Sequence, residues 1–268
     1  DLAEQETDPW QKATYQRIGE CCANIAWDAP RTYYEGVQWI HFGVMMDRVV
    51  GHGNGYGRLD LYLIDLYRKS KAAGELSDEE AREYISEMYL KLRGHFFSMG
   101  GRDAELKDAT NEMSFVALEA YDLVGDYNNL GVMWHPDINP EFYDYACDVL
   151  ARHGESLPVL VNYDLMYESE LRSGIPHEDA WKVVYSGCQW FCIPGKEYCD
   201  QDVNSIYLMA PMKRAIARGI EENVADFEAL YAIFADELVH TAQALREWKN
   251  TQYALLGSLW PEMYTSMI

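Results

Sequence analysis

The sequence of 268 residues predicts a helix-rich α/β protein. Two continuous apolar runs, at 131–134 and 157–162, are bounded by turn residues, which is typical of strands buried on both faces. The segment 140–153 between them has a helical pattern and begins with Pro140, a residue favoured in a first helical turn. A strand, a helix and a second strand in this order predict a right-handed crossover and parallel strand pairing.

Helical signals dominate the rest of the chain, and several include their boundary residues. Thr32 to Glu35 and Ser77 to Glu80 match capping boxes, in which a hydroxyl and a carboxylate each satisfy a free backbone N–H. Glycines at the expected helix ends favour left-handed termination, namely Gly74, Gly154, Gly174 and Gly219. The predicted helices span 10–27, 33–50, 58–72, 78–98, 109–123, 140–153, 163–173, 203–218 and 224–248.

A glycine-rich run, Gly51 to Gly57, connects two of these predicted helices. A dinucleotide-binding fingerprint requires a strand before the glycines and a helix after them. Because this run is expected to join two helices, it is interpreted as a flexible connection or as backbone held close to other groups, and not as a phosphate site.

Composition and charge limit the classes of partner. Hydrophobic residues make up 49% of the chain and aromatic residues 13%, so the protein is globular and not disordered. The formal net charge is −22, which repels nucleic acid and anionic lipid and excludes both as expected partners. No signal-peptide pattern or apolar stretch of membrane-spanning length occurs, and a cytoplasmic location is expected.

The six cysteines are too few for a disulfide scaffold in a chain of this length: Cys21, Cys22, Cys147, Cys188, Cys192 and Cys199. The spacing of the last three matches neither the usual zinc pairs nor the short triple of radical-generating iron–sulfur enzymes. No metal site is therefore assigned, although a thiolate metal protein stays an alternative.

Cys188 is the most informative of these residues. It follows Gly187 at the end of an apolar stretch and is followed by Gln189, Trp190 and Phe191. A glycine next to the thiol would let a turn present the sulfur to a cavity. A buried packing cysteine is the other interpretation that the residues leave open.

The histidines give weaker signals. His135 and His177 lie next to proline-marked turns and are interpreted as solvated, and His240 is expected on a helix surface. A cysteine and histidine hydrolase lacks an orienting third group at a suggestive spacing.

Five segments in order resemble the glycyl radical enzymes of the pyruvate formate-lyase superfamily. They are Ala29 to Gln38, Gly57 to Leu63, Asp108 to Ser114, Pro158 to Asp164, and Glu178 to Ala180 leading to Gly187 and Cys188. The resemblance implies a ten-stranded barrel of two parallel half-sheets wrapped by helices, with a catalytic cysteine on a central loop. The whole of 1–268 would then be part of one catalytic domain, with no internal boundary.

The resemblance also implies a radical mechanism with Cys188 as the catalytic residue. A radical S-adenosylmethionine activating enzyme would install a glycyl radical on a C-terminal loop, and Cys188 would carry the radical as a thiyl to a small organic substrate. The glycine loop is absent from these 268 residues, the chain starts without methionine and its end at Ile268 is abrupt. We therefore expect these 268 residues to be an internal segment that is inert alone. The remainder of its own chain or a complementary chain would complete the site, and the full protein would form a homodimer.

Two departures from the family pattern bear on the reaction. In dehydratases and decarboxylases of the family, a glutamate usually stands at the position that Trp190 occupies here. In formate acetyltransferases, a second cysteine stands at the position that Gln189 occupies here. Fumarate-adding synthases manage without that glutamate and are favoured by default. Expected substrate contacts are Gln189, Trp190, Asp202 and Trp39, and the alternative from another class is a non-catalytic helical interaction module with a buried cysteine.

Overall fold

A computed structural model of the chain describes residues 2–50, 55–92, 94–125, 129–154, 157–186, 190–196 and 206–259. The chain forms two compact units, residues 1–199 and 200–268. The prediction of a single catalytic domain stays a prediction.

The first unit is built on a four-stranded parallel sheet with the order β1-β2-β3-β4. Its strands are β1 (Gly55–Arg58), β2 (Phe96–Gly100), β3 (Asn129–Trp134) and β4 (Val159–Asn162). The predicted strands correspond to β3 and β4, which pair in parallel around helix α7 (Pro140–His153), as expected from the sequence.

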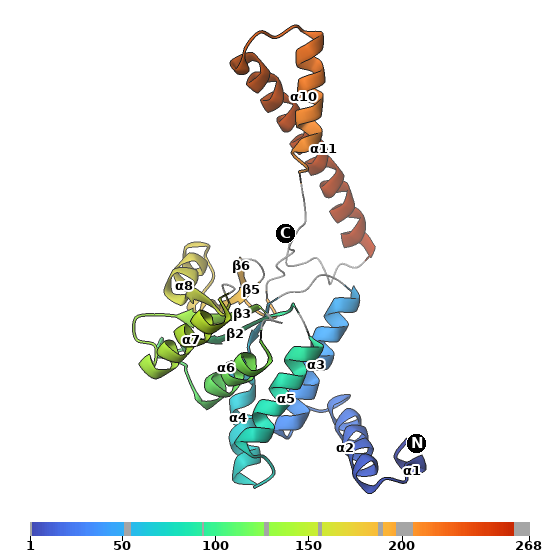
Figure 1. Cartoon of the computed structure of the whole chain (residues 1–268), viewed down its shortest axis with the longest axis vertical. Helices are drawn as coiled ribbons and strands as arrows, with labels where there is room; N and C mark the ends of the chain where they lie inside the picture. The colour runs from blue at the N-terminus through green and yellow to red at the C-terminus, as the bar shows by residue number, and fades with distance from the viewer. Residues whose placement is uncertain are drawn as a thin grey trace. The chain divides into compact units, whose positions relative to one another are not determined.

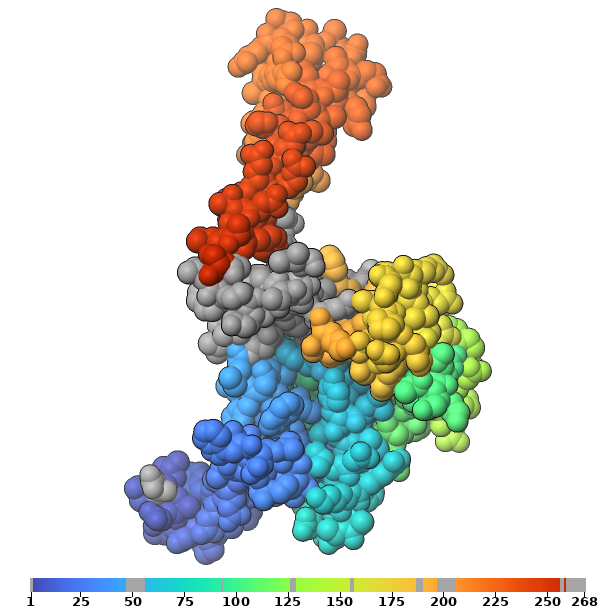
Figure 2. Space-filling model, turned by 180° about the vertical axis from the view of Figure 1, so that it is seen from behind, coloured from blue at the N-terminus to red at the C-terminus, as the bar shows by residue number. Residues whose placement is uncertain are grey.

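Helices cover one face of this sheet (Figure 1). The remaining helices of the unit are α1 (Leu2–Gln5), α2 (Pro9–Ile25), α3 (Tyr33–Val50), α4 (Leu59–Ala72), α5 (Asp78–Lys91), α6 (Glu112–Val124), α8 (Tyr163–Arg172) and α9 (His177–Ala180). Phe97, Met99, Leu130 and Val132 point into the main core, which the apolar faces of α3 to α7 complete. Figure 2 shows α2 in dark blue beside α3 in lighter blue.

The opposite face of the sheet carries the alternate residues of the same strands. Phe96, Ser98 and Met133 belong to this set, and all three are buried. They are covered by an antiparallel hairpin of β5 (Val184–Ser186) and β6 (Trp190–Cys192). The central strands β2 and β3 are therefore buried on both faces, as their apolar side chains require.

The second unit consists of two helices, α10 (Met209–Glu221) and α11 (Phe227–Leu259). Arg214 and Arg218 of α10 form ion pairs with Glu237 and Asp236 of α11. Helix α11 corresponds to the predicted helix 224–248 but extends further than expected, to Leu259.

Three predictions of local structure are wrong. Helix α5 ends at Lys91, so the predicted helix 78–98 overlaps strand β2. The glycine-rich run leads into β1 and does not simply connect two helices. Gly219 lies inside α10, where it gives room to Val224 and Leu230, and does not end the helix.

Most of the predicted helix boundaries are confirmed by their caps. Ser77 and Glu80 form the complete capping box, and Gly74, Gly154 and Gly174 have positive φ. The box at Thr32 is only half formed, because the Glu35 carboxylate accepts from Asn24 and the Arg31 N–H instead of returning to Thr32.

Candidate functional site

The hairpin that leads to Cys188 is anchored through Tyr185 on the face of the sheet opposite the main core. The Ser98 hydroxyl donates to the carbonyl of Tyr185 at 3.1 Å. The Tyr185 ring lies over Gly131, where an added Cβ would stand 2.6 Å from the ring. Phe96 meets the same ring edge-on, with centroids 6.1 Å apart. These contacts place β5 directly on strands β2 and β3.

A second anchor holds the chain just before β5. The carbonyl of Trp181 accepts hydrogen bonds from Arg58 Nη2 at 3.0 Å and from the Tyr163 hydroxyl at 2.8 Å. Arg58 is the last residue of β1 and Tyr163 is the first residue of α8. The end of strand β1 and the start of the helix that follows β4 therefore converge on one carbonyl group.

Arg58 also joins this anchor to the carboxyl end of β2. Its Nη1 atom donates to the carbonyls of Gly100 at 3.1 Å and Arg102 at 2.6 Å. Burial lowers the pKa of Arg58, and the nearby Asp60 carboxylate opposes that change. The guanidinium pKa starts so high that Arg58 stays charged.

Asp60 is the buried acid beside this network. Its carboxylate accepts from the Gly100 N–H at 2.8 Å and from the Ser114 hydroxyl at 2.5 Å. Burial raises the pKa of Asp60, while these two hydrogen bonds and the charge of Arg58 act in the opposite direction. The hydrogen bond between Asp60 and Gly100 fixes the start of α4 to the end of β2.

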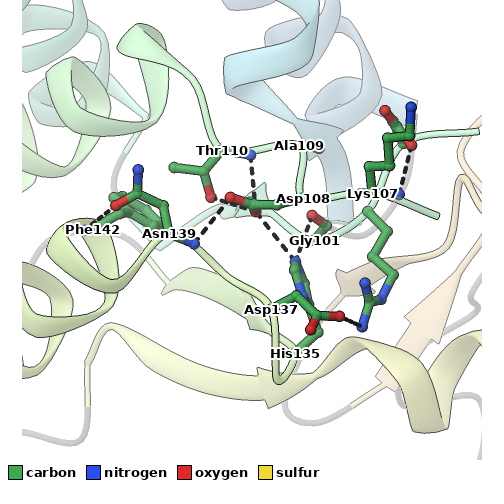
Figure 3. Close-up of polar contacts among 12 residues, drawn as sticks. Gly101, Lys107, Asp108, Ala109, Thr110, His135, Asp137, Asn139 and Phe142 are labelled. Atoms are coloured by element: carbon green, nitrogen blue, oxygen red, sulfur yellow. Dashed lines mark hydrogen bonds and ion pairs between the residues drawn. The ribbon is translucent and has the colours of Figure 1, made fainter. Parts of the chain in front are cut away.

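A second polar cluster surrounds Asp108, at the carboxyl ends of β2 and β3 (Figure 3). Asp108 accepts from the Thr110 hydroxyl at 2.8 Å and from the Asn139 N–H at 2.9 Å. His135 Nε2 lies 3.2 Å from Asp108 Oδ1 and 3.0 Å from the Gly101 carbonyl. Since His135 is fully buried, its interpretation as a solvated histidine is wrong.

The other histidine predictions have a different outcome. His177 is exposed but lies within hydrogen-bonding distance of the Tyr167 hydroxyl and the Ala104 carbonyl. His240 is exposed on α11, as expected. Within the described ranges, no group of three histidine, cysteine or acidic side chains is arranged to hold a metal ion.

The predicted site residues are only partly within the described chain. Cys188, Gln189 and Asp202 lie outside the described residues. Trp190 is the first residue of β6, pairs with Ser186 and is 53% exposed. Trp39 is also 53% exposed, and with Phe42, Met45 and Met46 it lines a hollow of about 550 Å³ between α2 and α3. Trp39 is therefore not packed into the core of the first unit.

Arg58, Ser98, Gly131 and Tyr163 were not predicted as parts of the site. Arg58 and Tyr163 fall within segments that carry the family resemblance, which was the available signal. Ser98 fell in a segment that was predicted to be helical. The alternation of a strand, which points Ser98 and Phe97 to opposite faces of the sheet, was therefore not considered.

The chain resembles curated proteins over about three quarters of its length. It is 26% identical over 221 residues to an isethionate sulfite-lyase from Oleidesulfovibrio alaskensis, which covers 74% of this chain and 26% of that protein. It is 24% identical over 222 residues to a trans-4-hydroxy-L-proline dehydratase from Clostridioides difficile, covering 73% of this chain and 28% of that protein. The chain therefore spans about a quarter of the length of these relatives.

Solved structures share the fold over nearly the whole chain. A structure describing 1,2-propanediol dehydration in Roseburia inulinivorans matches with a TM-score of 0.77 at 20% identity, over 94% of this chain and 36% of that one. A glycyl radical enzyme from Archaeoglobus fulgidus matches with a TM-score of 0.76 at 20% identity, over 94% of this chain and 37% of that one.

These likenesses define the fold class as the glycyl radical enzyme barrel, of which the chain forms a helix-rich part with a parallel sheet. The family model for pyruvate formate lyase-like proteins matches residues 1–268, and the chain belongs to that family. The predicted resemblance and the predicted fold class are thus confirmed.

Among the described helices, none combines the length and the apolar character needed to cross a lipid bilayer.

Proposed function

We propose that this chain supplies the thiyl-forming cysteine of a glycyl radical enzyme, with Cys188 as the catalytic residue. The observation that supports this most strongly is the anchoring of the β5–β6 hairpin on the face of the sheet opposite the main core. Cys188 is the middle residue of the three that connect these two strands. A hydrogen-atom carrier must be held at a fixed distance from its partners, and a short connection between two anchored strands suits that requirement.

The proposed reaction is radical C–X or C–C bond chemistry on a small organic substrate. The Cys188 thiyl would take a hydrogen atom from a substrate carbon, forming S–H and breaking C–H, and would return it to the product radical. The S–H bond is close in strength to an activated C–H bond, and so both transfers are reversible. The names of the relatives, a sulfite-lyase and a dehydratase, favour cleavage of a bond next to the substrate radical.

Trp190 favours a second candidate, addition to fumarate. The indole N–H is only a hydrogen-bond donor and cannot take a proton from a substrate hydroxyl. Elimination would need that proton to leave by another group, whereas addition to an alkene does not require it. Gln189, Trp190, Asp202 and Trp39 are proposed as substrate contacts in either case.

The remaining partners are also part of the proposal. The glycyl radical would lie elsewhere in the full protein and would be installed by a radical S-adenosylmethionine activating enzyme. This segment itself would bind no cofactor. The complete protein would be a cytoplasmic homodimer whose barrel closes around the substrate and excludes water.

The decisive experiment replaces Cys188 with alanine in the complete, activated protein. Isethionate, trans-4-hydroxy-L-proline and 1,2-propanediol serve as substrate probes, and electron paramagnetic resonance measures the glycyl radical. We expect the Cys188→Ala variant to keep the radical and to lose all turnover. Cys192→Ala, a change at a buried cysteine of β6, is the matched control and should retain turnover. Turnover retained by Cys188→Ala would reject Cys188 as the thiyl-forming residue.

A further inference from the structure

We propose that Arg58 and Tyr163 are positioning residues that hold the Cys188 hairpin at its working distance. This inference rests on the proposed function, because it assigns to two buried residues a role in hydrogen-atom transfer by Cys188. Neither side chain is proposed to touch the substrate. Both act through the carbonyl of Trp181, the point at which the chain enters the hairpin.

The geometry of Arg58 suits this role. The residue is 3% exposed, and its guanidinium binds three carbonyls, those of Gly100, Arg102 and Trp181. Gly100 is the last residue of β2 and Arg102 lies just after it, whereas Trp181 lies three residues before β5 begins at Val184. One planar group therefore ties the base of the hairpin to the sheet.

The guanidinium is itself held in place by aromatic rings. Its central carbon lies 5.8 Å from the ring centroid of Tyr163 and 5.4 Å from that of Trp181. The Tyr163 hydroxyl then donates to the same Trp181 carbonyl at 2.8 Å. A lysine could replace the charge but not the planar fork that reaches several carbonyls at once.

The position of Trp181 makes the anchor relevant to catalysis. Trp181 precedes Cys188 by seven residues, and Tyr185, the second anchored residue, precedes it by three. Release of the Trp181 carbonyl leaves the hairpin tied through Tyr185 and lets its base move. A displacement of about 1 Å between reacting groups can slow a reaction by roughly 100-fold.

The test measures exchange of the glycyl α-hydrogen in D₂O, which needs no substrate. The glycyl radical takes deuterium from the Cys188 S–D group, and so a C–D bond forms and the S–D bond breaks. The thiyl then takes the remaining hydrogen from the same carbon, and the resulting S–H group exchanges with solvent. The radical signal changes from its hydrogen splitting to the smaller deuterium splitting at a rate that reports the transfer.

In the complete activated protein, we expect exchange roughly 100-fold slower for Arg58→Lys and about fivefold slower for Tyr163→Phe. Tyr167→Phe is the matched control, because Tyr167 stacks on Tyr163 but its hydroxyl meets His177 instead of Trp181. Ser77→Ala weakens the α5 cap and controls for loss of stability alone. Both controls should exchange at the parent rate per radical.

The outcomes separate the two proposals. If Cys188→Ala exchanges at the parent rate, the proposed function fails. If Cys188→Ala stops exchange while Arg58→Lys and Tyr163→Phe match the parent, the function stands and the positioning role is overturned. A slowing by Ser77→Ala equal to that by Tyr163→Phe would also overturn it. Should Arg58→Lys not fold, Tyr163→Phe decides the question, since it removes one hydroxyl and keeps the ring.

Discussion

At the scale of single residues, the site depends on side chains whose roles come from distant partners. Gly131 shows this well: in the sequence it is only the first residue of an apolar run, whereas in the fold it makes room for Tyr185. Arg58 meets Trp181 across 123 positions of the chain. Local sequence patterns predict neither contact, because both arise from which strands lie side by side.

Replacement of Gly131 with alanine tests the close approach of β5 to the sheet. The new Cβ would lie 2.6 Å from Tyr185 Cδ1 and 3.0 Å from Tyr185 Cβ. We expect overpacking to lower the free energy of unfolding by about 2 kcal/mol, as measured by urea denaturation. Gly19→Ala is the matched control, since a Cβ there meets nothing within 4 Å in helix α2 and should add about 0.5–1 kcal/mol. Equal stability of the Gly131→Ala variant and the parent would contradict this packing.

At the scale of elements, the sequence predicted those whose signals are local. Helix α7 has Pro140 in its first turn and Gly154 at its end, and α5 has the Ser77 capping box. Strand β2, Phe96 to Gly100, was not predicted because only four residues separate it from the end of α5. Its apolar side chains also lie on both faces, so it lacks the alternation that distinguishes a strand from a continued helix. Strand β1 contains Gly55 and Gly57 and so lacks the apolar run that marks a strand.

The contact between the ends of α6 and α7 gives a prediction about pH. Asp122 of α6 accepts from Arg152 at 2.6 Å and meets His153 Nε2 at 3.1 Å. Partial burial raises the pKa of Asp122, but the hydrogen bonds from Arg152 and His153 outweigh it, and the net pKa is lowered. A carboxyl group with a lowered folded pKa stabilises the fold above its unfolded pKa, and this contribution is lost as pH falls through the folded value.

We therefore expect Asp122→Asn to lower the free energy of unfolding by about 0.5–1 kcal/mol at pH 7, a value limited by the partial exposure of the pair. The difference from the parent should shrink as the pH falls below about 4, the ordinary pKa of an unfolded aspartate, and vanish below the lowered pKa of folded Asp122. Urea denaturation across this pH range measures it. Asp144→Asn, at an exposed position of α7, should show no such trend, and a difference that grows toward low pH would refute the assignment.

At the scale of the whole molecule, the family resemblance predicted more than residue patterns alone. Composition and spacing gave an α/β class, whereas five ordered segments indicated the barrel that the family model and solved structures confirm. The proposed site is less complete, because Cys188, Gln189 and Asp202 lie outside the described residues. What the fold adds is the support around them, namely the anchors at Trp181 and Tyr185.

The two compact units should differ sharply when each is produced alone. The main core lies entirely within the first unit, from Tyr33 to Val149. Among the described residues of the second unit, only Pro211, Ala215, Gly219 and Ile233 are buried. Its exposed ion pairs, such as that between Arg218 and Asp236, contribute little, and helix pairs without a sizeable apolar interface are marginal in water.

We accordingly expect residues 2–196 to unfold in a sigmoidal thermal transition and residues 206–259 to lose helicity gradually, as followed by circular dichroism. Because the intrinsic helix propensity of the residues keeps an isolated helix partly formed, residues 206–259 should still show some helical signal at low temperature. Its order in the complete protein would then depend on contacts outside the segment itself. A steep, concentration-independent transition of residues 206–259 would contradict this, since it would require an apolar core that the described residues do not provide.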